Sequence, residues 1–267
     1  MEENYLEDMA AEMSVGGKVA LVTGGAQGLG RAFTVELLKR GAKVAITDVN
    51  EDVGRATQAE LCAEYGQDSV DFRVCDVTNS AAMAEAFSSI KETFGGLDIV
   101  INNAGVGNLE KGVWQNMVGV NVTGTFQGTM LAIEHMRRDK GGKGGVIINI
   151  ASMAGINPNP CGPVYAGTKA AILHFSRSWA ANPDMVQQGL RINVVCPAFA
   201  DTSLYRKILD FSTAYQPQIA QMIIDRVGLM TPEYVAENVM ELIEDTSKHG
   251  AVMTLSATEG KGYRSTA

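Results

Sequence analysis

The sequence predicts a single α/β domain built on a doubly wound parallel sheet of about seven strands, with helices on both faces. Three observations lead to this fold class. Strand-sized apolar runs alternate with helix-sized segments along the chain, and a glycine-rich turn joins the first strand to the first helix. The length of 267 residues suits one large domain with a full core. The pattern contains no internal repeat, linker or second domain.

The first half of the chain contains three strand–helix units in succession. A basic last turn followed by Gly41, and a glycine at position 66, mark the ends of the first two helices. We predict strands at Val19–Thr23, Lys43–Asp48 and Val70–Val74, and helices from Gly28 to Lys39, up to about Tyr65, and over Ser80–Phe94.

The second half continues the alternation up to a final strand. Predicted strands are Asp98–Ile101, Gly145–Ile150, Arg191–Val195 and Ala251–Leu255. Predicted helices are a long one over roughly Val113–Arg138, one that carries Lys169, and one that opens at Thr231–Pro232 with threonine as its cap. Residues 197–230 are expected to be irregular and partly helical.

Domain bounds follow from these elements. We expect residues 1–16 to form an acidic, flexible N-terminal tail, residues 17–257 to form the domain, and residues 258–267 to form a polar C-terminal tail. Residues 197–230 are predicted to be a substrate lid, whose apolar side chains, such as Tyr205, Met222 and Ile223, line a pocket or serve only for packing.

Composition and charge exclude several classes of partner. The net charge of −8 argues against nucleic acid and anionic membrane surfaces. The apolar runs are strand-sized and the acidic N-terminus lacks a basic, apolar leader, so we expect no membrane insertion and a cytoplasmic location. The four cysteines are scattered and the three histidines lie far apart, which predicts a reduced protein with no metal site.

The turn between the first strand and the first helix predicts a nucleotide site. Its spacing is Gly-x3-Gly-x-Gly, which permits a tight turn and lets the backbone approach a pyrophosphate at the helix N-terminus. The predicted contacts are Gly24, Gln27, Gly28, Leu29 and Gly30. The alternative is an ordinary turn without a ligand. The position of this glycine turn in the first strand–helix unit favours nucleotide binding.

Asp48 ends the second strand, where a carboxylate accepts hydrogen bonds from ribose hydroxyls and repels a 2′-phosphate. Val49 follows it, and no arginine or lysine stands beside it. The acid therefore favours NAD over NADP, unless it is only a solvated strand end.

Ser152, Tyr165 and Lys169 form the predicted catalytic group. Ser152 lies just past a strand, and Tyr165 and Lys169 are four residues apart at the start of a helix, so they leave one face of it. A nearby ammonium lowers the pKa of a phenol, which is otherwise near 10. The alternative is a half-buried tyrosine and a surface lysine.

Taken together, these elements resemble those of the short-chain dehydrogenase/reductase family over about Lys18 to Leu255. The matching elements occur in the family's order: the turn Thr23–Gly30, Asp48, Asp76, Asn102–Gly105, Asn121, Ser152, Tyr165 with Lys169, and Pro197. The resemblance implies a Rossmann-type sheet with the dinucleotide across the carboxyl ends of its strands. It extends the NAD contacts to Val49, Asp76, Val77, Asn103, Ala104, Gly105, Tyr165, Lys169, Pro197, Phe199 and Thr202.

The resemblance also implies a reaction, the oxidation of a secondary alcohol. Tyr165 would take the hydroxyl proton as hydride passes to the nicotinamide, and Ser152 would orient the substrate oxygen. Lys169, together with a water held by Asn121, would carry the proton to solvent. Because the cellular NAD pool is kept oxidised, we expect the oxidative direction.

Within the family, the chain is similar to the 15-hydroxyprostaglandin dehydrogenases. The similar fragments are Ala26–Phe33, Gly41–Ala45, Cys75–Thr78, Pro163–Tyr165 and Cys196–Pro197. This likeness implies a hydroxy fatty acid or an eicosanoid as substrate. Three positions depart from the pattern: Gly162 replaces a substrate-binding glutamine, Ala198 replaces a glycine, and Ala200 replaces a branched residue.

Two other functions remain open. The chain could be a dehydrogenase or carbonyl reductase of a steroid, sugar or other small alcohol, or a non-catalytic NAD-binding redox sensor. The family resemblance further implies a homodimer or homotetramer, paired through the helices that carry Asn121 and Lys169. Small residues on the second of these helices, at Ala166, Ala170 and Ala171, allow close helix contact.

Overall fold

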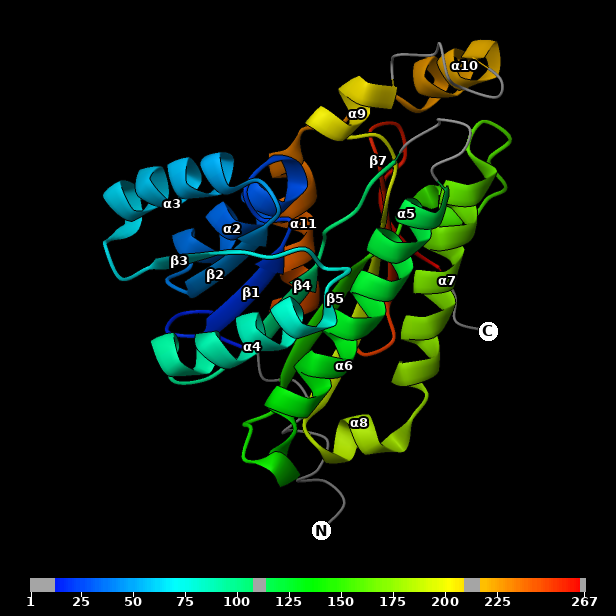
Figure 1. Cartoon of the computed structure of the whole chain (residues 1–267). Helices are drawn as coiled ribbons and strands as arrows, with labels where there is room; N and C mark the ends of the chain where they lie inside the picture. Colours follow the sequence, from blue (N-terminus) through cyan, green and yellow to red (C-terminus); the bar gives the residue numbers. More distant parts are fainter. Residues whose placement is uncertain (1–12, 108–113, 209–216, 265–267) are drawn as a thin grey trace.

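The computed structural model describes residues 13–107, 114–208 and 217–264. These residues form an eight-stranded sheet in the order β3-β2-β1-β4-β5-β6-β7-β8, with helices on both faces (Figure 1). The strands are β1 Val19–Thr23, β2 Lys43–Asp48, β3 Val70–Val74, β4 Ile99–Asn102, β5 Gly145–Ile150, β6 Leu190–Pro197, β7 Val252–Ser256 and β8 Gly260–Arg264. The predicted doubly wound α/β fold is confirmed.

Parallel pairing joins β1 to β7, and burial on both faces explains their sequences. Every residue of β1 and β4 is buried, so these strands are continuous apolar runs without alternation. The strand order changes direction at β1, which pairs with β2 on one side and with β4 on the other. The strands β2 and β3 lie on one side of β1, and β4 to β8 lie on the other. A ligand crevice is expected above this switch point, at the carboxyl ends of the two strands.

Two helical layers cover the sheet. On one face, α2 Gly28–Lys39, α3 Glu51–Tyr65 and α11 Pro232–Glu244 pack their apolar residues, such as Phe33 and Val239, into one core cluster. On the other face, α4 Ser80–Phe94 and α6 Thr125–Met136 form a second cluster around Phe87 and Met136. The helix α7, Pro163–Ala180, lies beside α6 on that face and buries Ile172 (Figure 1).

The predicted long helix is interrupted at the position of Asn121. It consists of α5 Trp114–Val118, a π-helical turn over Gly119–Gly124, and α6. A Cβ added at Gly124 would lie 2.6 Å from the Val77 side chain, so this turn packs closely on the β3–α4 connection. Asn121 lies within the π-helical turn. The predicted start at Val113 falls outside the described residues.

One short helix was not predicted. It is α8, Pro183–Gln187, which precedes β6. The Asn182 side chain accepts a hydrogen bond from the Asp184 N–H, and proline occupies the first turn. This asparagine cap followed by proline is a helix-start signal that the sequence carries.

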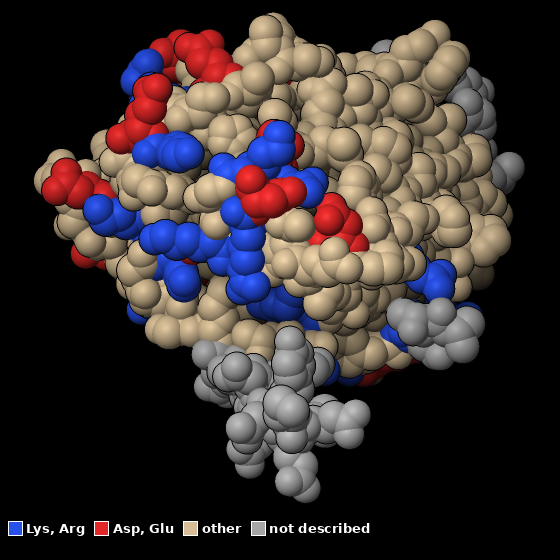
Figure 2. Space-filling model, turned by 90° about the horizontal axis from the view of Figure 1, so that it is seen from below, with Lys and Arg blue, Asp and Glu red and all other residues tan. Residues whose placement is uncertain are grey.

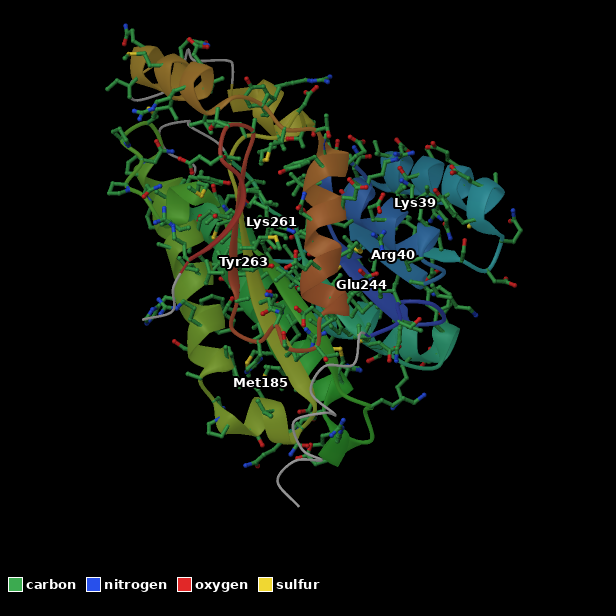
Figure 3. All side chains as sticks on the ribbon, turned by 180° about the vertical axis from the view of Figure 1, so that it is seen from behind. Lys39, Arg40, Met185, Glu244, Lys261 and Tyr263 are labelled. Atoms are coloured by element: carbon green, nitrogen blue, oxygen red, sulfur yellow. The ribbon has the colours of Figure 1, made fainter. Side chains whose placement is uncertain are left out.

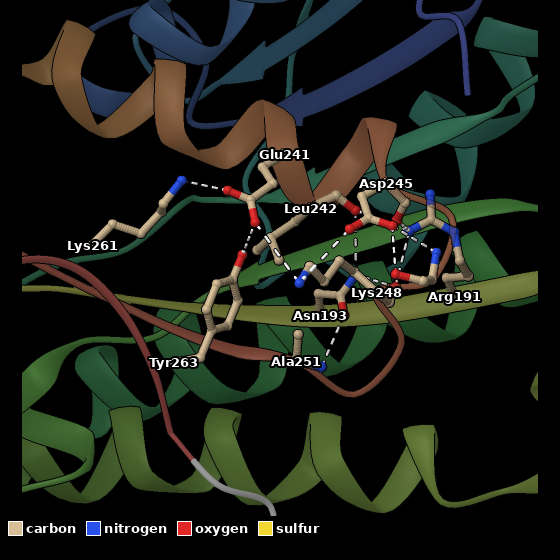
Figure 4. Close-up of polar contacts among 10 residues, drawn as sticks. Arg191, Asn193, Glu241, Leu242, Asp245, Lys248, Ala251, Lys261 and Tyr263 are labelled. Carbon is tan, nitrogen blue, oxygen red and sulfur yellow. Dashed lines mark hydrogen bonds and ion pairs between the residues drawn. The ribbon is translucent and has the colours of Figure 1, made fainter. Parts of the chain in front are cut away.

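The C-terminal segment corrects the prediction of a polar tail from residue 258. Gly260–Arg264 forms β8, antiparallel to β7, which gives eight strands rather than seven. Lys261 and Tyr263 of β8 both bind Glu241 of α11, and Figures 3 and 4 show them beside that helix. Because polar contacts rather than apolar alternation hold this edge strand, its sequence lacks a strand pattern.

The predicted N-terminal tail also ends earlier than residue 16. Val15 is 3% exposed, and the Met13 N–H donates to the Glu244 carbonyl at the end of α11. Glu244 also pairs with Arg40, and both are labelled in Figure 3. The domain therefore includes residues from Met13 onwards, while residues 1–12 lie outside the described part.

The lid region contains two helices above the carboxyl ends of the strands. These are α9 Ser203–Ile208 and α10 Pro217–Val227 (Figure 1). An isolated parallel β-bridge pairs Ala200 with Met230, so the two ends of the lid region lie side by side. Residues 209–216, which the sequence assigned to the same apolar wall, lie outside the described residues.

Charged side chains gather at the opposite end of the sheet. Figure 2 shows a band of lysine and arginine side chains on this face, interrupted by acidic ones. Several are paired: Arg137 contacts Asp139 and Asp184, and Lys18 contacts Asp98. Among the residues that the structure describes, no helical segment combines the length and apolar character needed to cross a bilayer.

Candidate active site

The turn between β1 and α2 is shaped by its glycines. Gly24 and Gly28 have φ values of 62° and 56°, a region that favours glycine. A Cβ at Gly30 would lie 2.0 Å from the Gly24 carbonyl oxygen, so a side chain there would displace the turn. Gln27, the N-cap of α2, provides no side-chain cap for the helix. The turn and the N-terminus of α2 therefore fit a phosphate group.

The segment after β4 fixes this turn from the side. The Asn103 N–H donates to Thr23 Oγ1 at 3.0 Å, and its Nδ2 donates to the carbonyl oxygens of Thr23 and Gly24. The Ala104 N–H also donates to Thr23 Oγ1, at 3.1 Å. The two strands at the switch point are thus joined at their carboxyl ends.

Asp48 lies at the end of β2, next to the glycine turn. Its side chain is buried and accepts hydrogen bonds from the N–H groups of Ala26, at 3.3 Å, and Asn50, at 3.1 Å. Both carboxylate oxygens are therefore oriented by the backbone. The arrangement suits acceptance of ribose hydroxyls and disfavours a phosphate at the same place.

Asp76 follows the neighbouring strand at the same edge of the sheet. The Cys75 N–H donates to the Asp48 carbonyl, which brings the ends of β2 and β3 together. The exposed Asp76 carboxylate accepts from the N–H and the hydroxyl of Thr78, both at 2.8 Å. Val77 is buried beneath it.

Ser152 lies beyond the end of β5 and caps a 3-10 turn over Met153–Gly155. Its Oγ accepts from the Ala154 N–H at 3.1 Å and lies 3.4 Å from the Pro197 carbonyl oxygen, within donating distance. The hydroxyl also forms a hydrogen bond with the phenol of Tyr165. The structure thus brings the predicted serine and tyrosine together.

Lys169 lies one turn of α7 beyond Tyr165, with its Nζ 5.7 Å from the phenol ring centroid. Lys169 is 4% exposed and donates to the Ile150 carbonyl oxygen at 2.8 Å. Burial lowers the pKa of Lys169 to about 8. It is not a surface lysine.

The pKa of Tyr165 corrects one expectation. Burial raises it above its ordinary value, and the hydrogen bond from Ser152 opposes this only in part. The expected lowering by Lys169 is not among the causes of the shift, and burial of the phenol sets its direction. A positive charge placed beside the phenol would lower the pKa of Tyr165.

Asn121 is fully buried, and both ends of its amide are engaged. Its Oδ1 accepts from the Val106 N–H at 2.8 Å, and its Nδ2 donates to the Val106 carbonyl at 2.9 Å and to Thr168 Oγ1 at 3.1 Å. A Cβ added at Gly105 would lie 3.4 Å from Asn121 Oδ1 and 3.6 Å from Lys169 Nζ. The Asn121 amide and the Lys169 ammonium therefore both lie next to the Gly105 backbone.

The remaining predicted contacts lie at the base of the lid. Pro197 ends β6, and Phe199 accepts from the Met230 N–H and lies with its ring centroid 5.9 Å from that of Tyr205. The Thr202 methyl would lie 3.3 Å from a Cβ at Gly28. Ser203 Oγ donates to Gln27 Oε1 at 3.2 Å. The glycine turn and the lid are therefore in contact.

Two residues of the site were not predicted. Thr168 joins Asn121 to α7, and only its place between Tyr165 and Lys169 could have singled it out. Cys196 is fully buried, and burial raises the pKa of its thiol to about 12, so it is not a nucleophile. Among the described residues, no His/Cys/Asp/Glu group could hold a metal ion.

Comparison with known proteins identifies the family. The family model described as short chain dehydrogenase matches residues 18–212. The chain belongs to the short-chain dehydrogenase family.

Relatives within this family cover nearly the whole chain. The rat 15-hydroxyprostaglandin dehydrogenase [NAD(+)] is 39% identical over 253 residues, which are 93% of this chain and 94% of the relative. The human enzyme of that name is 38% identical over the same shares. LinX of Sphingobium indicum, a 2,5-dichloro-2,5-cyclohexadiene-1,4-diol dehydrogenase, is 35% identical over 87% of this chain and 91% of its own length.

A solved structure shares the fold of this short-chain dehydrogenase. The crystal structure of gox2181 superposes with a TM-score of 0.78 and 29% identity, over 94% of this chain and 96% of the other. The family model and the sequence identities confirm the predicted resemblance to the family and to its 15-hydroxyprostaglandin dehydrogenases. The roles of individual site residues stay predictions.

Proposed function

We propose that this chain is an NAD-dependent oxidoreductase that oxidises a secondary alcohol to a ketone. The observation that carries the proposal is the hydrogen-bonded pair Ser152 and Tyr165, with the buried Lys169 beside it. The three groups lie at the carboxyl edge of the sheet, close to the nucleotide turn. Support also comes from the relatives, several of which are named as dehydrogenases of alcohols.

The residues at this edge suit NAD. The turn from Gly24 to Gly30 would hold the pyrophosphate, Asp48 would accept the ribose hydroxyls, and Asp76 would accept from the adenine amino group. The further contacts would be Gln27, Leu29, Val49, Val77, Asn103, Ala104, Gly105, Tyr165, Lys169, Pro197, Phe199 and Thr202. When bound, the nicotinamide ring would take up the hydride and place a positive charge near Tyr165.

Side chains of the protein would then accept the proton of the alcohol and pass it on. Tyr165 takes the proton of the substrate hydroxyl, and Ser152 holds the substrate oxygen and stabilises its developing charge. Lys169 has a pKa of about 8, so it can accept and release a proton close to neutral pH. It is therefore suited to pass the proton on, with Asn121 at the next position.

A hydroxy fatty acid or a 15-hydroxyprostaglandin-like lipid is the substrate that the relatives favour. The described part of the lid presents apolar side chains, with Met222 69% and Leu229 42% exposed. Gly162 has no side chain to bind the substrate oxygen, so Ser152 and Tyr165 must do so. A steroid, sugar or other small alcohol is the alternative.

A substrate panel followed by NADH absorbance tests this proposal. Purified protein is mixed with NAD and secondary alcohols from each class, and the Tyr165→Phe variant serves as the catalytic control. We expect turnover of a long-chain hydroxy acid, lost in Tyr165→Phe while the affinity for NAD is nearly unchanged. If NAD binds but no alcohol or ketone reacts, the redox-sensor alternative replaces the enzyme.

We further propose a homodimer or homotetramer formed through α6 and α7. Phe126 of α6 stacks on Phe175 of α7, with ring centroids 3.7 Å apart, and Trp179 lies edge-on to Phe175. Met130 of α6 is 49% exposed, and Ala170 of α7 is also exposed. Only monomer in a sizing measurement at micromolar concentration would contradict this assembly. A cytoplasmic location stays a prediction.

A further inference from the structure

The hydroxyl of Thr168 connects two parts of the site that otherwise approach from different elements. Thr168 is 3% exposed and lies on α7 directly before Lys169. Its Oγ1 donates to the Tyr165 carbonyl oxygen at 2.7 Å and accepts from Asn121 Nδ2 at 3.1 Å. One hydroxyl therefore contacts the backbone of the proposed base and the side chain of the π-helical asparagine.

The Thr168 hydroxyl and the Val106 backbone require the same orientation of the Asn121 amide. Because the single proton of the Thr168 hydroxyl is used on Tyr165, the oxygen can only accept from Asn121. The amide must then turn its nitrogen towards Thr168, and its oxygen faces the Val106 N–H. All three hydrogen bonds of Asn121 are made in this one orientation, and they use both N–H groups of the amide.

Val106 is the segment that this amide holds in place. Asn121 binds both its N–H and its carbonyl oxygen, immediately after Gly105. The Gly105 backbone approaches Lys169 Nζ so closely that a Cβ there would lie 3.6 Å from it. The position of this backbone therefore determines what lies next to the Lys169 ammonium.

We propose that Thr168 is a positioning residue for the proton transfer. Through Asn121 it holds the Gly105–Val106 backbone against Lys169, and through its donated bond it anchors the turn of α7 that carries Tyr165. The proposal rests on the proposed function and deepens it. It assigns a task to a buried hydroxyl whose hydrogen bonds go to Asn121 and to the Tyr165 backbone.

The variant Thr168→Val removes the hydroxyl and keeps the shape of the side chain. We expect kcat to fall about tenfold, the loss of roughly one buried hydrogen bond, while the KM for NAD stays within about twofold. The solvent deuterium isotope effect on kcat rises, because proton transfer becomes slower relative to the other steps. Thr168→Ser, which restores the hydroxyl, recovers most of the loss.

A matched control comes from the same helix. Ser178 donates to the His174 carbonyl in the same manner but is exposed, with no bond to Asn121 among its described contacts. Ser178→Ala should leave kcat and the isotope effect unchanged. If Thr168→Val does not fold, Thr168→Cys carries the test, because it retains a side chain of similar size with only a weak donor.

A second measurement separates this proposal from the proposed function. Hydrogen exchange at the Val106 amide is followed in the wild type and in Thr168→Val, in the absence of substrate. We expect faster exchange in the variant, and unchanged exchange would overturn the positioning role even for an active enzyme. A wild type that oxidises no alcohol but shows this change would overturn the function alone. The proposal would also be rejected if Thr168→Val had the same kcat and the same isotope effect as the wild type.

Discussion

Lys169 Nζ lies 2.8 Å from the carbonyl oxygen of Ile150, and the structure pairs it with no carboxylate among the described residues. A buried ammonium bound only to a neutral oxygen is costly to charge. Burial therefore lowers the pKa of Lys169 from 10.5 to about 8. This relationship makes the stability of the protein depend on pH in a direction that can be measured.

The Lys169→Met variant tests that dependence. Between pH 8 and 10.5 the unfolded wild type binds more protons at this lysine than the folded protein does, so the free energy of unfolding rises with pH. Below pH 8 the full cost of charging the amine is present. We expect the variant to lose about 3 kcal/mol relative to the wild type from pH 7 to pH 10.5 in denaturant unfolding. A difference independent of pH would contradict the lowered pKa.

Tyr165 should titrate later than an ordinary tyrosine when no NAD is present. Burial holds its pKa above 10, so absorbance at 295 nm from this phenolate should appear only at higher pH. The signal is the difference between wild type and Tyr165→Phe, and Tyr234→Phe serves as a control. Added NAD should shift the transition to lower pH, because a positive charge nearby favours the phenolate. If Tyr165 titrated at the pH of an ordinary tyrosine and added NAD did not shift the transition, Tyr165 would be excluded as the base.

Asp48 should set the preference for NAD. Asp48→Ser removes the charge that repels a 2′-phosphate, so we expect the ratio of kcat/KM for NAD over NADP to fall about tenfold or more. Asp52→Ser, an exposed acid on α3, is the control for a general change in surface charge. Equal ratios in the two variants would show that the preference has another origin.

The sequence located most of this site because its signals are local. The glycine spacing, the acid at Asp48 and the pair Tyr165 and Lys169 are each defined by a few neighbouring residues, and parallel strands bring their ends to one edge. The contacts of Asn121 with Val106 and with Thr168 join residues that are 15 and 47 positions apart in the chain. Periodicity alone could not reveal them.

The fold was predicted less well where polar contacts replace apolar patterns. The strand β8 has exposed residues and is held by Glu241, so nothing in its own sequence marks it as a strand. Val15 is buried in the core cluster to which α11 also contributes, and the acidic residues before it made it seem part of a tail. In both cases the partners lie far away in the sequence.

Gly30→Ala should damage the nucleotide turn. The added Cβ would lie 2.0 Å from the Gly24 carbonyl oxygen and 2.6 Å from Asn103 Nδ2, so the turn and its brace must move. We expect the Kd for NAD to rise at least tenfold, measured by fluorescence titration or calorimetry. Gly167→Ala is the control, because a Cβ there meets nothing within 4 Å. That variant should bind NAD normally and be more stable by about 0.5–1 kcal/mol.

Arg191 should be the most sensitive basic residue outside the site. Its guanidinium donates to four carbonyl oxygens at the end of α11 and in the loop after it, those of Leu242, Ile243, Asp245 and Lys248 (Figure 4). A lysine cannot reproduce this fork, and the released carbonyl groups would lose their partners. We expect Arg191→Lys to lower the free energy of unfolding by about 2–3 kcal/mol. Arg73→Lys, at an exposed position paired with Asp71, should change it by less than about 0.5 kcal/mol. Equal effects of the two substitutions would show that Arg191 does not hold α11 to β6.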